Sequence, residues 1–272
     1  RYSILKAIIF CLSIFTLFAI IKTLMQKFIG FDSFETKWLN AGGATTHIIW
    51  SGIRYFSFFT DASNMGANMG AAIMFFGIAS LYMRSALCKI YYSCIAILAL
   101  YALFLSGTRG AIIVPLAGLA LYTLISKQTK MVIGGASMLL FIYIFFAFTT
   151  IGQSNSSIRR IRTAFNPTKD ASYIVRKENQ KKLATYLKYK PFGEGLGLSG
   201  DGLGVKISTR FTTSIPTDSW YVKIWVETGI VGLILYLSMI FFTIGWGGWI
   251  IATQIKDLEL KGLLSGLLCG IF

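Results

Sequence analysis

Long apolar stretches constrain the fold of this sequence more than any other feature. Four of them are close to the length that crosses a bilayer: Ile4–Leu24, Met65–Met83, Met131–Thr150 and Gly229–Ala252. Because a membrane-spanning helix needs about 20 mainly apolar residues, each stretch predicts one span. A fifth stretch, Ile90–Ile125, is about 36 residues long, which is enough for two spans.

The two spans within Ile90–Ile125 should be separated by a turn at "SGTRG", residues 106–110. Two glycines favour a tight turn because glycine reaches left-handed backbone angles without steric cost. Arg109 is the one charged residue of the stretch. A charge is costly in hydrocarbon, so we expect Arg109 at a membrane surface, where its guanidinium reaches headgroups or water.

A further apolar run starts at Gly262, so the sequence predicts an all-α polytopic membrane protein with about seven transmembrane helices. The composition, 55% hydrophobic and 14% charged residues, agrees with this class. The sequence begins at Arg1 and ends within an apolar run too short to span. We therefore expect residues 1–272 to form a single transmembrane domain, a fragment of a longer chain with a truncated last span.

The loops predict the orientation of these spans. Three short loops share one face and carry lysine or arginine: Arg84–Lys89, Lys127–Lys130 and Lys256–Lys261. Short basic loops stay cytoplasmic, whereas loops longer than about 60 residues translocate largely regardless of charge. Residues 152–228 should then form a large external (periplasmic) loop, on the same face as Arg54 and Arg109.

The net charge of +15 is compatible with nucleic acid, anionic lipid or an anionic substrate. Half of the 26 lysines and arginines lie in residues 152–228. An external position of this loop argues against nucleic acid, which leaves membrane lipids and an anionic substrate as partners. Within the loop we expect two helices, Ser156–Phe165 and Ala171–Lys190, the second ended by Pro191.

The second predicted helix has an apolar stripe at helical spacing, formed by Tyr173, Arg176, Gln180, Leu183, Ala184 and Leu187. Arg176 should therefore point toward the protein or the bilayer surface, while Lys177 lies beyond the edge of the stripe. The glycines that follow lack a phosphate-loop pattern, so they predict a flexible turn.

No metal or cofactor site is indicated. The four cysteines lie in or beside apolar runs without a C-x-x-C pattern. His47, the one histidine, is interpreted as a loop residue rather than a ligand. Gly66 and Gly70 have the spacing that lets helices approach closely, and we expect them to pack within the chain.

Three stretches resemble motifs of one family. "SGTRGAIIVPL" is similar to an S-R-G turn between two spans, "RKENQKKLATYLKYKPFGEGLG" to an arginine-led helix ending in P-x-G-x-G, and "PTDSWYVKIWVETGIVGL" to H-[NS]-x-[YF]-L-x-x-x-x-E-x-G-x-x-G. A weaker fourth is "IRYFSFFTDASNMGA". Together they resemble the O-antigen ligase and O-antigen polymerase (Wzy-type) family of bacterial inner-membrane glycan transferases. The resemblance implies a GT-C-like fold with its core in residues 90–252.

The resemblance also implies roles for individual residues. Arg109 and Arg176 match the family's essential external arginines, which engage the pyrophosphate of a polyprenyl-linked glycan donor; Arg54 matches less closely. The catalytic histidine of the family's ligases falls at Asp218. This difference favours a polymerase acting on the periplasmic face of the inner membrane, with a ligase that joins glycan to lipid A-core as the alternative.

We therefore expect Arg109, Arg176 and Asp218 to be catalytic, with Asp218 as the base for the acceptor hydroxyl. The expected substrate-binding residues are Arg54, Lys177, Glu194, Arg210 and Glu227, of which the two glutamates are weaker candidates for the base. The reaction requires no metal or cofactor. A transporter of lipid-linked anionic substrates would use the same arginines without chemistry. A membrane scaffold would use the basic loop to bind anionic headgroups.

Overall fold

The computed structural model of the chain describes residues 2–49, 52–126, 129–152, 158–159, 162, 171–200 and 204–271. These residues are mainly helical and include one pair of two-residue strands. They divide into two compact units. The first unit comprises residues 1–165 and 246–272, and the second comprises residues 166–245.

The first unit contains the apolar helices and the loop segments between them. Its elements are α1 (Tyr2–Phe28), α2 (Ser33–Trp38), η1 (Leu39–Gly43), α3 (Ala44–His47), β1 (Ile48–Ile49), β2 (Gly52–Ile53), α4 (Ala62–Tyr82), α5 (Ala86–Ser106), η2 (Gly110–Ile112), α6 (Ile113–Ser126), α7 (Thr129–Phe148) and α12 (Leu258–Ile271). The second unit contains α9 (Ala171–Leu187), α10 (Gly204–Ile207), η4 (Phe211–Ser214) and α11 (Trp220–Thr253) as far as Gly245.

A helix occupies each apolar stretch of the sequence. Within the described ranges, four are long and apolar enough to cross a membrane: Ser3–Phe28, Ala62–Tyr82, Ala86–Ser106 and Trp220–Thr253. Large apolar side chains on their outer faces are exposed, for example Ile97 and Phe241. Because water would penalise such surfaces, they fit contact with lipid. The chain is therefore a polytopic membrane protein, and the number of about seven spans stays a prediction.

The predicted turn within Ile90–Ile125 is confirmed. Helix α5 ends at Ser106, and Gly107 follows in the left-handed conformation with a φ of 57°. The chain then passes through Arg109 into η2 and α6. Arg109 is half-buried at this end of the helices, so its place in the turn removes it from the middle of the apolar stretch.

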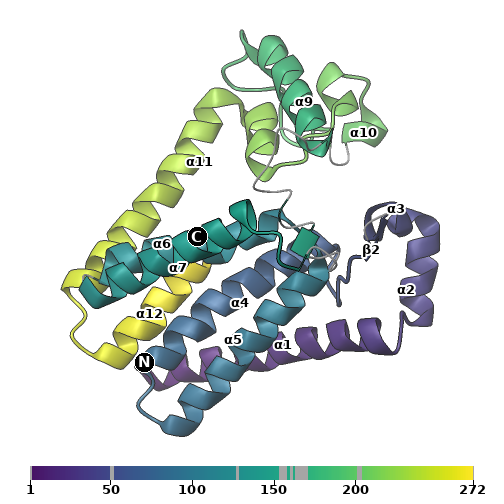
Figure 1. The fold of residues 1–272 in the computed structure, drawn as a ribbon. Helices are drawn as coiled ribbons and strands as arrows, with labels where there is room; N and C mark the ends of the chain where they lie inside the picture. The colour runs from purple at the N-terminus through teal and green to yellow at the C-terminus, as the bar shows by residue number, and fades with distance from the viewer. Residues whose placement is uncertain are drawn as a thin grey trace. The chain divides into compact units, whose positions relative to one another are not determined.

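Helix α4 is the centre of the first unit (Figure 1). Of its membrane-spanning window 61% is buried, against 28% for α5. Its side chains Met69 and Phe76 pack with Ile20 of α1 and Ile95 of α5 in one apolar cluster. Small residues allow this central position. A Cβ on Gly266 of α12 would lie 2.8 Å from the Phe75 carbonyl oxygen, so the two backbones meet without a side chain between them.

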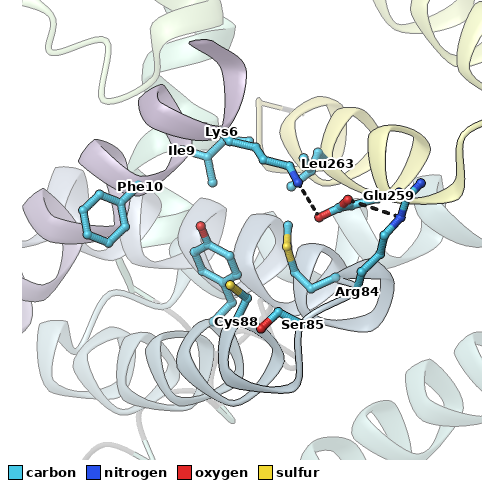
Figure 2. Close-up of a pocket in the computed structure, with 10 residues that line it drawn as sticks. Lys6, Ile9, Phe10, Arg84, Ser85, Cys88, Glu259 and Leu263 are labelled. Atoms are coloured by element: carbon cyan, nitrogen blue, oxygen red, sulfur yellow. Dashed lines mark ion pairs between the residues drawn. The ribbon is translucent and has the colours of Figure 1, made fainter. Parts of the chain in front are cut away.

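A buried carboxylate lies at the end of the bundle where the chain turns from α4 into α5. Glu259 at the start of α12 is 4% exposed and pairs with Lys6 Nζ at 3.0 Å and Arg84 Nε at 3.6 Å. The three side chains border a cavity of about 370 Å³ with mainly apolar walls, and Figure 2 shows Lys6 and Arg84 reaching Glu259 from opposite sides. These ion pairs join α1, the α4–α5 turn and α12.

The second unit is built around the C-terminal half of α9. Leu183 and Leu187 are buried against Ile215 and Val226. The predicted stripe on this helix is correct only for these two leucines, because Tyr173 and Arg176 in the N-terminal half are exposed. Of the first predicted loop helix, Ser156–Phe165, all but residues 158, 159 and 162 lie outside the described residues.

Candidate functional site

Arg54 is placed by a short hairpin that precedes α4. Strands β1 and β2 pair antiparallel, with Ile48 opposite Ile53. The hydrogen bond from the Arg54 backbone N–H to the His47 carbonyl, at 2.8 Å, extends this pairing by one step. The next residue, Tyr55, donates from its backbone to the Leu105 carbonyl at 3.2 Å. Both bonds hold Arg54 against the end of α5.

The Arg54 side chain binds the turn that carries Arg109. Its Nη2 donates to the Thr108 hydroxyl at 2.8 Å and to the Ser63 hydroxyl at 3.2 Å. Its Nη1 donates to the Thr46 carbonyl at 3.1 Å, and its Nε to the Ser106 carbonyl at 3.4 Å. All four acceptors are neutral oxygens, so these bonds orient the guanidinium without cancelling its charge.

Arg54 and Arg109 are electrostatically coupled. Burial, together with the nearby Arg109 charge, lowers the pKa of Arg54, while Asp61 opposes that decrease. A guanidinium with a lowered pKa still stays protonated at neutral pH. Two guanidiniums outnumber the neighbouring Asp61 carboxylate, and this favours a ligand with adjacent negative charges.

The turn itself is fixed by close packing on α4. A Cβ on Gly66 would lie 2.7 Å from Ser106 Oγ, and one on Gly70 would lie 3.0 Å from Val114 Cβ. The prediction that Gly66 and Gly70 pack within the chain is confirmed. Asp61 caps α4 by accepting from the backbone N–H groups of Ser63 and Asn64 at 2.6 and 2.9 Å. The start of α4 is therefore a rigid support for the arginine pair.

In the second unit, Arg176 faces Asp218. The Arg176 Nε atom lies 3.9 Å from Asp218 Oδ2, and the two side chains are 53% and 39% exposed. An exposed ion pair of this length is worth about 0–1 kcal/mol. Asp218 has a φ of 52°, a left-handed angle that aspartate tolerates better than most residues. Asp218 lies two residues before α11, and its carboxylate faces Arg176 on α9.

Glu194 is held by cations on both sides. Its side chain is 4% exposed, accepts from Arg210 Nη1 at 2.8 Å and pairs with Lys190. Burial alone would raise its pKa, but hydrogen bonds from Lys190, Tyr186 and Arg210 hold the pKa of Glu194 below its ordinary value. Glu194 and Arg210 are thus engaged with each other within this unit.

Glu227 lies where the glycine-rich turn docks on α11. Its carboxylate accepts from the Ser199 hydroxyl at 2.7 Å, and its backbone carbonyl accepts from Gly195 at 3.0 Å. A Cβ on Gly193 would lie 2.5 Å from the Gly229 nitrogen. The turn that the sequence predicts as flexible is therefore seated on α11 through its backbone.

The structure thus brings the predicted residues together in pairs. Arg54 and Arg109 share the first unit, and Arg176 with Asp218 and Glu194 with Arg210 share the second. Lys177 is exposed on α9.

Sequence reasoning missed Thr108, Lys190 and Ser199, although Thr108 lies within the turn "SGTRG". Among the described residues, no group of three or more His, Cys, Asp or Glu side chains has a metal-binding arrangement.

Comparison with known families decides the assignment. A model of the family described as "Wzy_C: O-Antigen ligase" matches residues 94–237, which is more than half of the chain. The chain belongs to the O-antigen ligase family. The matched range includes Arg109, Arg176 and Asp218, whereas Arg54 precedes it. A search of curated proteins and a search of solved structures give no match.

Membership of the O-antigen ligase family confirms the resemblance drawn from the three motifs. It makes the chain a membrane protein of the glycosyltransferase type in the broad sense, and its substrates lipid-linked glycans in general.

Proposed function

We propose that this protein polymerises polyprenyl-pyrophosphate-linked glycan units on the periplasmic face of the inner membrane. The observation that carries the proposal is the pair formed by Arg54 and Arg109 at one end of a membrane bundle, in which neutral oxygens orient the Arg54 guanidinium. A diphosphate has the adjacent negative charges that two neighbouring guanidiniums bind. The family match to O-antigen ligases supports the lipid-linked donor.

The arginines act on the leaving group. When the acceptor hydroxyl attacks the anomeric carbon, its C–O bond forms as the bond to the diphosphate breaks, and negative charge builds on the departing polyprenyl diphosphate. Guanidinium groups bind such oxygens in a bidentate fork. A guanidinium that is held in place before the reaction stabilises the transition state without reorganisation. In this mechanism Arg109 and Arg176 grip the diphosphate, while Arg54 and Lys177 attract it.

Asp218 is the proposed base. Its ion pair with Arg176 is long and exposed, so a diphosphate that binds Arg176 breaks this pair at little cost. Asp218 then accepts the proton of the acceptor hydroxyl. Glu194 suits this role less well, since two cations already engage it and a lowered pKa makes a weaker base. Glu227 stays a second candidate, next to the Ser199 hydroxyl.

The polymerase is preferred to the ligase because Asp218 occupies the position at which the resemblance places the ligases' histidine. A polymerase uses a second lipid-linked glycan as acceptor, whereas a ligase uses lipid A-core. Purified protein given lipid-linked repeat units, with and without lipid A-core, separates the two. Longer lipid-linked chains support the polymerase, transfer to lipid A-core alone supports the ligase, and movement of unchanged lipid identifies a transporter.

Substitution of the arginines tests the mechanism in the same assay. Arg109→Lys and Arg176→Lys keep a positive charge but lose the bidentate fork, so both should abolish chain extension at normal protein levels. Arg84→Lys is the matched control. Arg84 follows the C-terminal end of α4, about 30 Å from the end that supports Arg54 and Arg109 for a helix of this length. Normal long-chain polysaccharide from both variants would refute the assignment.

A further inference from the structure

His47 is enclosed in the loop that carries Arg54. Its side chain is 1% exposed, and its ring lies 5.0 Å from the Trp38 ring and 4.8 Å from the Phe56 ring, centroid to centroid, in edge-on contacts. The sequence contains one histidine, so a titration of imidazole in this chain reports on this site.

Its hydrogen bonds define one protonation state. The Ala62 backbone N–H lies 3.2 Å from Nε2, and because an amide N–H can only donate, Nε2 must accept. The proton of the neutral ring is then on Nδ1, which lies 3.0 Å from the Gly43 carbonyl oxygen and 2.8 Å from the Thr46 hydroxyl. A second proton on Nε2 would face the Ala62 N–H, so the arrangement excludes the charged imidazolium.

Two routes connect this ring to Arg54. Along the chain, the His47 and Thr46 carbonyls accept from the Arg54 backbone and from its Nη1 at 2.8 and 3.1 Å. Across the helix start, the Ala62 residue whose N–H reaches the ring also accepts the Thr108 hydroxyl at 3.0 Å. That hydroxyl in turn accepts from Arg54 Nη2. A change at His47 therefore reaches the guanidinium from both sides.

We propose that neutral His47 is a positioning residue for Arg54, and that its protonation releases Arg54 from the Thr108 turn and weakens donor binding. The inference rests on the proposed function, because it assigns Arg54 to the donor site. It adds that donor binding weakens at acid pH because of a side chain that does not touch the substrate.

The surrounding charges favour the neutral ring. Burial lowers the pKa of His47, and the nearby Arg54 charge acts in the same direction, whereas the Gly43 carbonyl and Asp61 oppose the decrease. The net pKa lies below its ordinary value of about 6.5. The unfolded chain therefore binds the proton more readily, so this contribution to stability is complete above pH 6.5 and declines as the pH falls below it.

Activity measured between pH 5 and 8 on the full chain in detergent tests the proposal, with lipid-linked repeat units as substrate. Below the ordinary histidine pKa, the KM for the donor should rise while kcat changes little, since a positioning defect acts on binding. His47→Gln keeps an acceptor for Ala62 without a titrating ring, so it should retain activity at pH 7.5 and lose the acid rise in KM. His47→Phe should raise KM about tenfold at every pH, the loss expected for a charge-assisted hydrogen bond.

A double-substitution cycle removes folding as an explanation. If His47 acts through Arg54, the variant His47→Phe/Arg54→Gln should bind the donor no more weakly than Arg54→Gln. Additive losses would overturn the proposal, as would an acid rise in KM that His47→Gln leaves unchanged. A separate readout is the fluorescence of Trp38, which imidazolium quenches: the acid change in emission should vanish in His47→Gln and in Trp38→Phe, and a surviving change would contradict the assignment.

These outcomes separate the inference from the function on which it rests. If Arg109→Lys and Arg176→Lys abolish glycan transfer while His47→Phe behaves as the wild type, the positioning role fails and the proposed function stands. If both arginine variants remain active, the proposed function fails, and the role of His47 in it fails as well.

Discussion

Arg54 Nη2 donates a hydrogen bond of 2.8 Å to the hydroxyl of Thr108, a residue 54 positions further along the chain. The same hydroxyl donates to the Ala62 carbonyl at 3.0 Å. One threonine thus joins the loop before α4, the start of α4 and the turn after α5. Since Arg109 is its direct neighbour, the position of one arginine depends on the residue that holds the other.

Thr108→Val should therefore lower activity without unfolding the protein. Valine keeps the shape of threonine but removes the hydroxyl that orients Arg54, and a hydrogen bond to a charged group is worth about 1.5–3 kcal/mol. We expect kcat/KM for the lipid-linked donor to fall roughly 10- to 100-fold. Thr123→Val is the control, because Thr123 bonds the Ala120 carbonyl within α6. Equal activity of the two variants would argue against a role for the Arg54 bond.

Gly66→Ala should disturb the same turn from the side of α4. The added Cβ would lie 2.7 Å from Ser106 Oγ and 2.8 Å from Ala111 Cβ, so the turn must move away from α4. We expect a clear loss of transfer activity and a loss of stability of about 1–3 kcal/mol from overpacking. Gly77→Ala on the same helix places its Cβ 3.9 Å from Ala96 and should be tolerated. The melting temperature and the turnover of each purified variant measure the losses of stability and of activity.

The membrane helices and the place of Arg109 were predictable because both follow from one strong physical rule. Hydrocarbon rejects charge, so apolar length marks the spans and a lone arginine marks their junction. The structure agrees, with Gly107 left-handed two residues before Arg109. The partners of Arg54 were not predictable, because Thr46, Ser63 and Thr108 lie in separate segments that only the fold brings together.

The face of α9 shows where periodicity misleads. A stripe through Tyr173, Arg176, Leu183 and Leu187 is regular in the sequence, yet the chain covers only the leucines, with Ile215 and Val226. Tertiary contacts of later segments decide which turns of an amphipathic helix are buried. For the same reason Glu194 could be named as an acidic candidate, while its engagement by Lys190 and Arg210 required the fold.

The pH dependence of stability should report on Glu194. Its folded-state pKa is lowered by Lys190, Tyr186 and Arg210 against the opposing effect of burial, so the contribution to stability is present above the unfolded pKa of about 4.3 and declines as the pH falls below it. Glu194→Gln should lower the melting temperature at pH 7, and the difference from wild type should narrow below pH 4.3. Glu178→Gln, on the exposed face of α9, should change little. A constant difference at all pH values would contradict this assignment.

Gly229→Ala should strongly destabilise the second unit. Gly229 has a φ of 70° and a ψ of −172°, a conformation open essentially to glycine alone, and a Cβ there would lie 2.0 Å from the Pro191 carbonyl oxygen. Strain and overlap together should cost about 3 kcal/mol or more and separate the glycine-rich turn from α11. Gly245→Ala lies in the same helix with nothing within 4 Å of its Cβ, and should be neutral or slightly stabilising. Thermal unfolding of both variants in detergent provides the measurement, and equal melting temperatures would show that the turn does not depend on this close approach.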